Sequence, residues 1–133
     1  MTTDEIQSII SYAYPLIQSK IKSSFGSGKG PIPKIDTSHR NTYAMHSGEP
    51  EAEGEHAETS IAEYYKGIIY LYLPNITNKK ELLRSIIHEY THYLQNITPL
   101  KTRIANQQYT YETNPYEQEA HANEKRWKEF LQK

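Results

Sequence analysis

The sequence contains no cysteine among its 133 residues. Without cysteine the chain can form no disulfide, has no thiolate nucleophile and cannot bind a metal through sulfur. Histidine and carboxylate side chains are the remaining zinc ligands, and the chain has six histidines. Any zinc site in this chain must therefore be built from nitrogen and oxygen ligands.

Long hydrophobic runs and an excess of charge of one sign are also missing. No apolar run approaches the ~20 residues needed to span a bilayer, and 15 Lys and Arg balance 16 Asp and Glu. The first five residues, MTTDE, are acidic where a secretory signal is basic. We therefore expect a cytoplasmic protein without a membrane segment. The charge balance gives no indication of a nucleic-acid partner, and it leaves the oligomeric state open.

The length fits one domain, residues 1–133, which can bury a single core. Thr2 and Glu5 have the spacing of a capping box, and apolar residues follow at helical intervals, so we expect an N-terminal helix within residues 1–22. Pro15 removes one backbone hydrogen bond and is expected to kink or divide this helix. Glycines and prolines predict a loop over 23–33.

Residues 35–73 contain the material for a small sheet of two to four strands. Ile35 to Met45 is a weak strand candidate, whereas 59–73 is rich in β-branched and aromatic residues. Lys66-Gly67 interrupts the second stretch, which predicts two short strands joined as a hairpin. A strand beside a metal-binding helix could also hold an extended peptide by adding it to the sheet edge.

Residues 47–58 are acidic, contain glycine and proline and show no periodicity, which predicts a mobile loop. His39, His46 and His56 lie in or beside this loop. Histidines scattered in polar loops are usually exposed to solvent, so we do not assign these three to a site.

Residues 79–95 have the pattern of a helix with a broad buried face. Asn78 and Glu81 have the spacing of a second capping box. The segment 96–106 is expected to end the helix, since Pro99 within it disfavours continuation. The apolar positions at spacings of three and four are Leu82, Leu83, Ile86, Ile87, Tyr90, Tyr93 and Leu94.

The same segment contains the motif His-Glu-x-x-His at residues 88–92. On a helix, His88 and His92 stand one turn apart on one face, where their imidazoles can bind one zinc ion. Glu89 lies beside the metal and can accept a proton from the attacking water. A catalytic zinc site usually has a third protein ligand, which must come from another part of the chain.

A second helix is expected over residues 115–131. It begins with an asparagine cap, Asn114, followed by Pro115 at the first helical position and Glu117 at the third. Its period places Tyr116, Ala120, Asn123, Trp127 and Phe130 on the inner face.

This helix offers three candidates for the third metal ligand: Glu117, Glu119 and His121. Glu117 and His121 are four residues apart and share a face, whereas Glu119 points roughly 200° away from Glu117. At most one of the two glutamates can meet the metal. Periodicity does not decide between them, because Glu117 is equally suited to act as a capping glutamate that reaches back to Asn114.

The segment His88 to Gln95, together with Glu117-Gln118-Glu119-Ala120-His121, resembles the zincin metallopeptidases of the gluzincin type, in particular the small ImmA/IrrE-type proteins. The resemblance covers roughly the C-terminal half of the chain. It implies that Glu117 is the third zinc ligand and that a polar residue four positions later supports it. His121 stands at that position, where the family tends to have Asn or Asp.

The sequence therefore predicts an α+β fold: a compact, minimal zincin-like domain with an N-terminal helix, a small sheet, an active-site helix and a C-terminal helix. The function that we expect is zinc-dependent peptide hydrolysis, with Zn²⁺ bound by His88, His92 and Glu117 and with Glu89 as general base. The partner would be a peptide or protein substrate. The alternative is a zinc-binding regulatory or protein-interaction module without general proteolytic activity.

Overall fold

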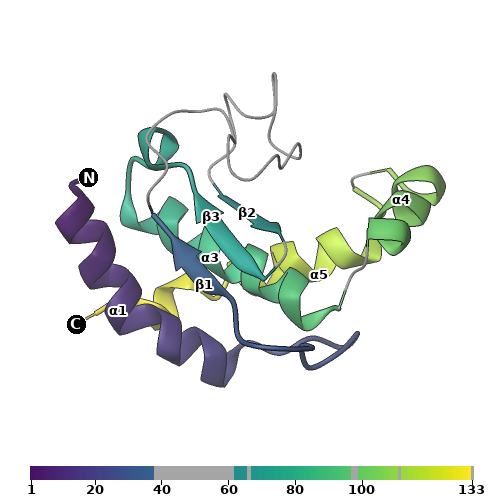
Figure 1. Ribbon diagram of the computed structural model, residues 1–133, viewed down its shortest axis with the longest axis horizontal. Helices are drawn as coiled ribbons and strands as arrows, with labels where there is room; N and C mark the ends of the chain where they lie inside the picture. The colour runs from purple at the N-terminus through teal and green to yellow at the C-terminus, as the bar shows by residue number, and fades with distance from the viewer. Residues whose placement is uncertain (38–61, 66, 97–98, 111, 133) are drawn as a thin grey trace.

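The computed structural model describes residues 1–37, 62–65, 67–96, 99–110 and 112–132. It confirms a small α+β fold, with helices packed on a three-stranded sheet (Figure 1). The helices are α1 (Thr3–Lys20), α3 (Lys79–Leu94), α4 (Pro99–Gln108) and α5 (Pro115–Glu124), the strands are β1 (Lys34–Asp36), β2 (Ala62–Tyr65) and β3 (Ile68–Leu71), and the 3-10 turns are η1 (Leu73–Asn75) and η2 (Trp127–Phe130).

The sheet has the order β1-β3-β2, with β1 parallel and β2 antiparallel to β3. The predicted hairpin is confirmed, and its turn contains Gly67 at φ +80°, a backbone conformation that favours glycine. The weak strand candidate is described only as the short β1. The rest of that candidate, the predicted mobile loop 47–58 and His39, His46 and His56 lie outside the described residues.

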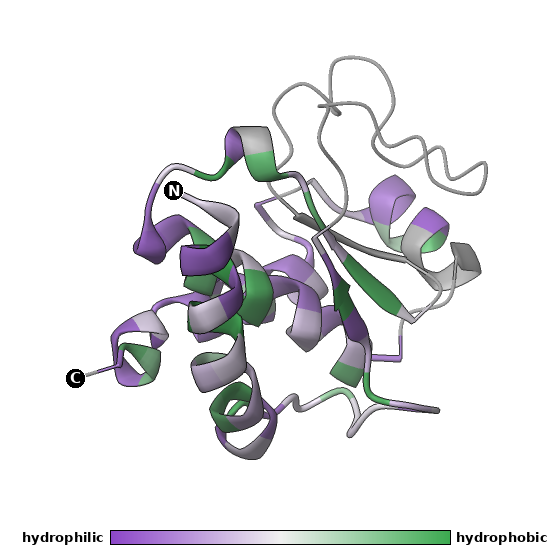
Figure 2. Ribbon diagram, turned by 60° about the vertical axis from the view of Figure 1, so that its left-hand side comes forward, coloured by the Kyte–Doolittle hydropathy of each residue, from purple (hydrophilic) through white to green (hydrophobic). Residues whose placement is uncertain are grey.

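Helix α3 is the centre of the fold, because it contacts α1, β2, β3, α5 and η2. All seven of its predicted apolar positions are buried, so the predicted inner face is confirmed. Hydrophobic residues accordingly gather on β3 and where α1 and α3 face each other (Figure 2). The opposite side of α3 is left for polar side chains, and α5 packs there in the antiparallel direction, with Glu124 beside Arg84 and Glu117 beside His92.

The start of α3 matches the prediction in part. The side chain of Asn78 caps the helix by accepting a hydrogen bond of 2.9 Å from the Glu81 N–H. Glu81 does not complete the expected capping box, because its carboxylate accepts from the Thr77 hydroxyl at 3.1 Å. The cap itself is present, and it fixes the residue at which the helix begins.

Helix α1 begins with a complete capping box between Thr2 and Glu5, as predicted. The helix runs through Pro15 and is not divided there. Buried residues on both sides of the proline, Tyr14 and Ile17, hold the two halves against the same core. Within the described part of the chain, α1 included, no helix is both long enough and apolar enough to cross a membrane.

The expected C-terminal helix over 115–131 is too long. The α-helix ends at Glu124, and residues Trp127–Phe130 form the separate 3-10 turn η2. The N–H groups of Lys125 and Arg126 donate to carbonyls three residues back, which tightens the last turn of α5. The change of direction buries Phe130 in the core, where it is 1% exposed.

Helix α4 was not predicted, since the segment 96–106 was expected only to end the preceding helix. Pro99 is the first residue of α4, a position that proline favours. Only Ala105 among its described side chains is buried, whereas Ile104 is 43% exposed. Apolar residues are sparse in the sequence of α4, so they give little periodic signal.

Candidate metal centre

The two histidines of α3 meet as the helical spacing predicts. Their ring centroids are 4.7 Å apart, and the Nε2 atoms of His88 and His92 are separated by 3.1 Å. The residues on the other face of α3 are buried in the core, so the pair is held on the side that faces α5.

Glu117 brings its carboxylate to this histidine pair. Its Oε2 lies 3.2 Å from the Nε2 of His88, and its Oε1 lies 3.0 Å from the Nε2 of His92. Glu117 does not act as a capping glutamate, because the Asn114 N–H donates instead to the Thr110 carbonyl at 3.0 Å. The asparagine side chain still caps α5 through the Tyr116 N–H at 3.0 Å, which places the first turn of α5 beside α3.

The three groups fit the requirements of a zinc site. Ligands about 2.0 to 2.1 Å from a tetrahedral zinc ion lie roughly 3.3 Å apart, and the contacts among these three side chains measure 3.0 to 3.2 Å. The side chains of His88, His92 and Glu117 are 18%, 16% and 21% exposed, so the centre is sheltered but open to solvent. Two imidazoles and one carboxylate are nitrogen and oxygen ligands that zinc accepts.

Each histidine of the pair also has a partner for its second ring nitrogen. The Nδ1 of His88 lies 2.7 Å from Oε2 of Glu124, and the Nδ1 of His92 lies 2.8 Å from Oε1 of Gln95. Because both partner atoms accept hydrogen bonds, each histidine donates from Nδ1, which leaves Nε2 as the nitrogen that would bind a metal after losing its proton. Histidines that bind metals are usually held in this way.

Sequence reasoning missed Gln95 and Glu124, although both belong to the centre. The signals that could have found them are positional. Glu124 follows Glu117 by seven residues, which is about two helical turns, and Gln95 follows His92 by three. Glu124 is 8% exposed and Gln95 is 3% exposed, and burial of such polar groups requires hydrogen-bond partners.

The remaining ligand candidates are Glu119 and His121. Glu119 contacts the loop after α1, whereas His121 contacts His88 and Glu124. The carboxylate of Glu119 faces away from the histidine pair and accepts hydrogen bonds from the backbone and hydroxyl of Ser24 at 2.8 and 2.7 Å. His121 packs its ring against His88, with centroids 5.1 Å apart, and its Nδ1 lies 2.7 Å from Oε2 of Glu124. His121, His88 and Glu117 form a second group with ligand atoms within 4.8 Å of one another.

Glu89 is buried to 9% exposure beside the histidine pair. One carboxylate oxygen of Glu89 and one nitrogen of each histidine lie within 4.8 Å of one another. The carboxylate is therefore within reach of a water molecule bound between these groups, the position that a general base requires.

The close carboxylates change the acidity of the histidines in the protein alone. Burial by itself would lower the pKa of His88, but hydrogen bonds to Glu117 and Glu124 outweigh it and raise the pKa to about 10. Burial opposes protonation of His92 as well, yet the contact with Glu117 raises its pKa. Burial would raise the pKa of Glu117, whereas the hydrogen bonds with both histidines lower it. A bound cation would take the place of these shared protons.

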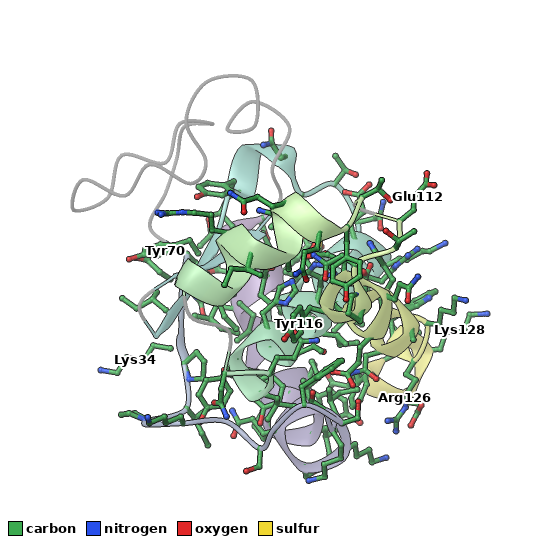
Figure 3. The ribbon with its side chains drawn as sticks, turned by 90° about the vertical axis from the view of Figure 1, so that its right-hand side faces the viewer. Lys34, Tyr70, Glu112, Tyr116, Arg126 and Lys128 are labelled. Atoms are coloured by element: carbon green, nitrogen blue, oxygen red, sulfur yellow. The ribbon has the colours of Figure 1, made fainter. Side chains whose placement is uncertain are left out.

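Figure 3 shows the molecule from the side of α4 and α5, with Tyr116 at the start of α5 near the middle of the view. Arg126 and Lys128, which follow α5, project at the edge of the molecule. Tyr116 packs against Phe25, with ring centroids 4.7 Å apart. The loop that follows α1 is thereby held against the beginning of α5.

Comparison of the chain with protein-family models, with curated proteins and with solved structures finds no match.

Proposed function

We propose that this chain is a zinc-dependent metallopeptidase of the gluzincin type. The observation that supports the proposal most directly is the convergence of His88, His92 and Glu117, with contacts of 3.0 to 3.2 Å between their ligand atoms. The buried Glu89 beside the histidines and the Nδ1 partners Glu124 and Gln95 support it further.

Each residue of the centre has a separate role in the proposed hydrolysis. His88, His92 and Glu117 would hold the ion, which when bound lowers the pKa of water toward ~7 and polarises a peptide carbonyl. Glu89 accepts the proton of the attacking water and later returns it to the leaving amine. Glu124 and Gln95 keep the two imidazoles in the orientation that binding requires.

The sheet offers a place for an extended peptide substrate. Strand β2 is at the edge of the described sheet and contacts α3, the helix that contains the histidines. A peptide that added to this edge would run beside the metal helix.

The test is the variant Glu89→Gln, assayed on denatured casein and on a peptide library. We expect the zinc-loaded wild-type chain to cleave, a chelator to abolish cleavage, and Glu89→Gln to bind zinc normally while its rate falls about 10²- to 10⁴-fold. Glu112→Gln, a change at an exposed carboxylate before α5, is the matched control and should cleave at the wild-type rate. Wild-type rates in Glu89→Gln would contradict the mechanism.

A further inference from the structure

Gln95, at the end of α3, uses every polar atom of its side chain. Its Oε1 lies 2.8 Å from the Nδ1 of His92. Its Nε2 donates to the carbonyl of Tyr116 at 2.9 Å and to Oε1 of Glu119 at 3.0 Å. With the side chain buried, these three contacts account for both amide hydrogens and for the carbonyl oxygen.

The two partners of the Gln95 nitrogen determine which way the amide faces. A carbonyl oxygen and a carboxylate can only accept hydrogen bonds, so the NH₂ group must point toward Tyr116 and Glu119. The amide oxygen then faces His92, which must donate from Nδ1. When His92 loses its second proton, its lone pair is consequently on Nε2, the atom 3.0 Å from Glu117.

Glu119 is itself fixed on its other side by the loop that follows α1. The hydroxyl of Ser23 donates to Oε1 of Glu119, while the N–H and hydroxyl of Ser24 donate to Oε2 at 2.8 and 2.7 Å. The carboxylate thus joins three segments: this loop, the end of α3 and the first turns of α5. Its position cannot change without moving the amide of Gln95.

We propose that Glu119 is a positioning residue of the metal centre, which acts through Gln95 to hold His92 with Nε2 toward the ion. This inference rests on the proposed function, because it takes His92 to be a zinc ligand. It extends that function to a residue which contacts neither the histidine pair nor the ion, and it gives the Ser23–Ser24 loop a connection to the centre.

A double-mutant cycle on zinc affinity tests the connection. The zinc dissociation constant is measured by competition with a chromophoric chelator for the wild-type chain, Glu119→Ala, Gln95→Leu and the double variant. We expect Gln95→Leu to weaken zinc binding about 10- to 100-fold. Glu119→Ala should weaken it by ~3- to 10-fold, because Glu119 affects His92 only through Gln95. The double variant should bind no more weakly than Gln95→Leu alone.

Two controls separate positioning from general stability. Gln118→Ala changes an exposed neighbour on α5 and should leave zinc affinity unchanged. The double change Ser23→Ala and Ser24→Ala removes the two hydroxyl contacts with Glu119 but keeps the Ser24 N–H contact and the bond between Glu119 and Gln95. It should therefore lower the thermal midpoint and change zinc affinity by less than about threefold.

A nuclear magnetic resonance measurement keeps the inference testable should Gln95→Leu fail to fold. The Nδ1 proton of His92 should exchange with water faster in zinc-loaded Glu119→Ala than in the wild type. Unchanged zinc affinity and unchanged exchange in Glu119→Ala, or fully additive effects in the double variant, would overturn the inference while leaving the proposed function intact. A wild-type chain that binds no zinc would overturn both.

Discussion

Each histidine of the centre uses both of its ring nitrogens. Nε2 of His88 and of His92 faces Glu117, while the Nδ1 atoms face Glu124 and Gln95. Rotation of either ring would break two contacts at once, so the imidazoles are fixed before any ion binds. A metal that enters such a centre meets ligands already in place, and less conformational entropy is lost on binding.

The same contacts predict that the stability of the chelated chain and its affinity for zinc change in opposite directions with pH. In the chelated chain, the raised pKa of His88, about 10, stabilises the fold fully below its ordinary value of ~6.5. This stability is lost as the pH rises toward 10. The lowered pKa of Glu117 acts in the other direction, because its contribution is present above ~4.5 and lost as the pH falls.

We therefore expect the urea midpoint of the chelated chain to be highest near pH 5 to 6.5 and to fall steadily between pH 6.5 and 9. Zinc affinity should rise over that same interval, because the histidines must lose their protons to bind the ion. Chemical unfolding and chelator competition in one buffer series measure both quantities. A chelated chain whose stability rises between pH 6.5 and 9 would contradict the assigned contacts.

Helix α5 contributes two carboxylates to the centre, and both lie on one face of the helix. Glu117 and Glu124 are seven residues apart, about two turns, and both meet His88 of the antiparallel α3. Glu124 also accepts from Arg84 at 3.1 Å and lies 2.7 Å from His121. One carboxylate therefore fixes the orientation of Arg84, His88 and His121 where the two helices pack together.

Replacement of Glu124 by glutamine should weaken zinc binding by about 10- to 100-fold, because the amide cannot accept from His88, His121 and Arg84 together. Chelator competition measures the change, and circular dichroism checks that the helices remain. Glu112→Gln, which removes a carboxylate exposed before α5, serves as the control and should bind zinc as the wild type does. Equal affinity in Glu124→Gln would show that Glu124 has no role in holding His88.

Elements with caps and strong periodicity were predictable from the sequence. Helix α3 begins after Asn78 as its pattern indicates, and the hairpin turns at Gly67. The end of α5 was not predictable, because the turn before η2 depends on the burial of Phe130 against distant residues. Helix α4 was missed because its packing leaves Ile104 exposed and gives no regular apolar pattern.

The residues of the centre also differ in how far the sequence predicts them. His88, Glu89 and His92 follow from a local motif on one helix. The choice of Glu117 needed the resemblance to gluzincins, because the sequence does not specify which face of α5 meets α3. The spacing places Gln95 on the face of His92 and Glu124 on the face of Glu117, but whether they reach the histidines depends on how the two helices cross, which local spacing does not specify.

At the scale of the whole molecule, α3 connects the core to the centre. One face of this helix is buried against α1 and the sheet, and the other faces α5. An ion held by His88, His92 and Glu117 would link α3 to α5, two helices between which α4 lies in the chain. Because the chain has no cysteine, a disulfide cannot link these segments, whereas a bound metal can. Metal binding to the folded chain would raise the free energy of unfolding.

The most direct test of the account is the ligand set of zinc in the purified chain, measured by X-ray absorption at the zinc edge together with the zinc content. We predict one zinc per chain, with two imidazole nitrogens and a carboxylate oxygen at about 2.0 to 2.2 Å. The carboxylate should be lost in Glu117→Ala and kept in Glu119→Ala. A chain without stoichiometric zinc, or a zinc environment without two imidazoles, would contradict the central claim that His88, His92 and Glu117 form a metal centre.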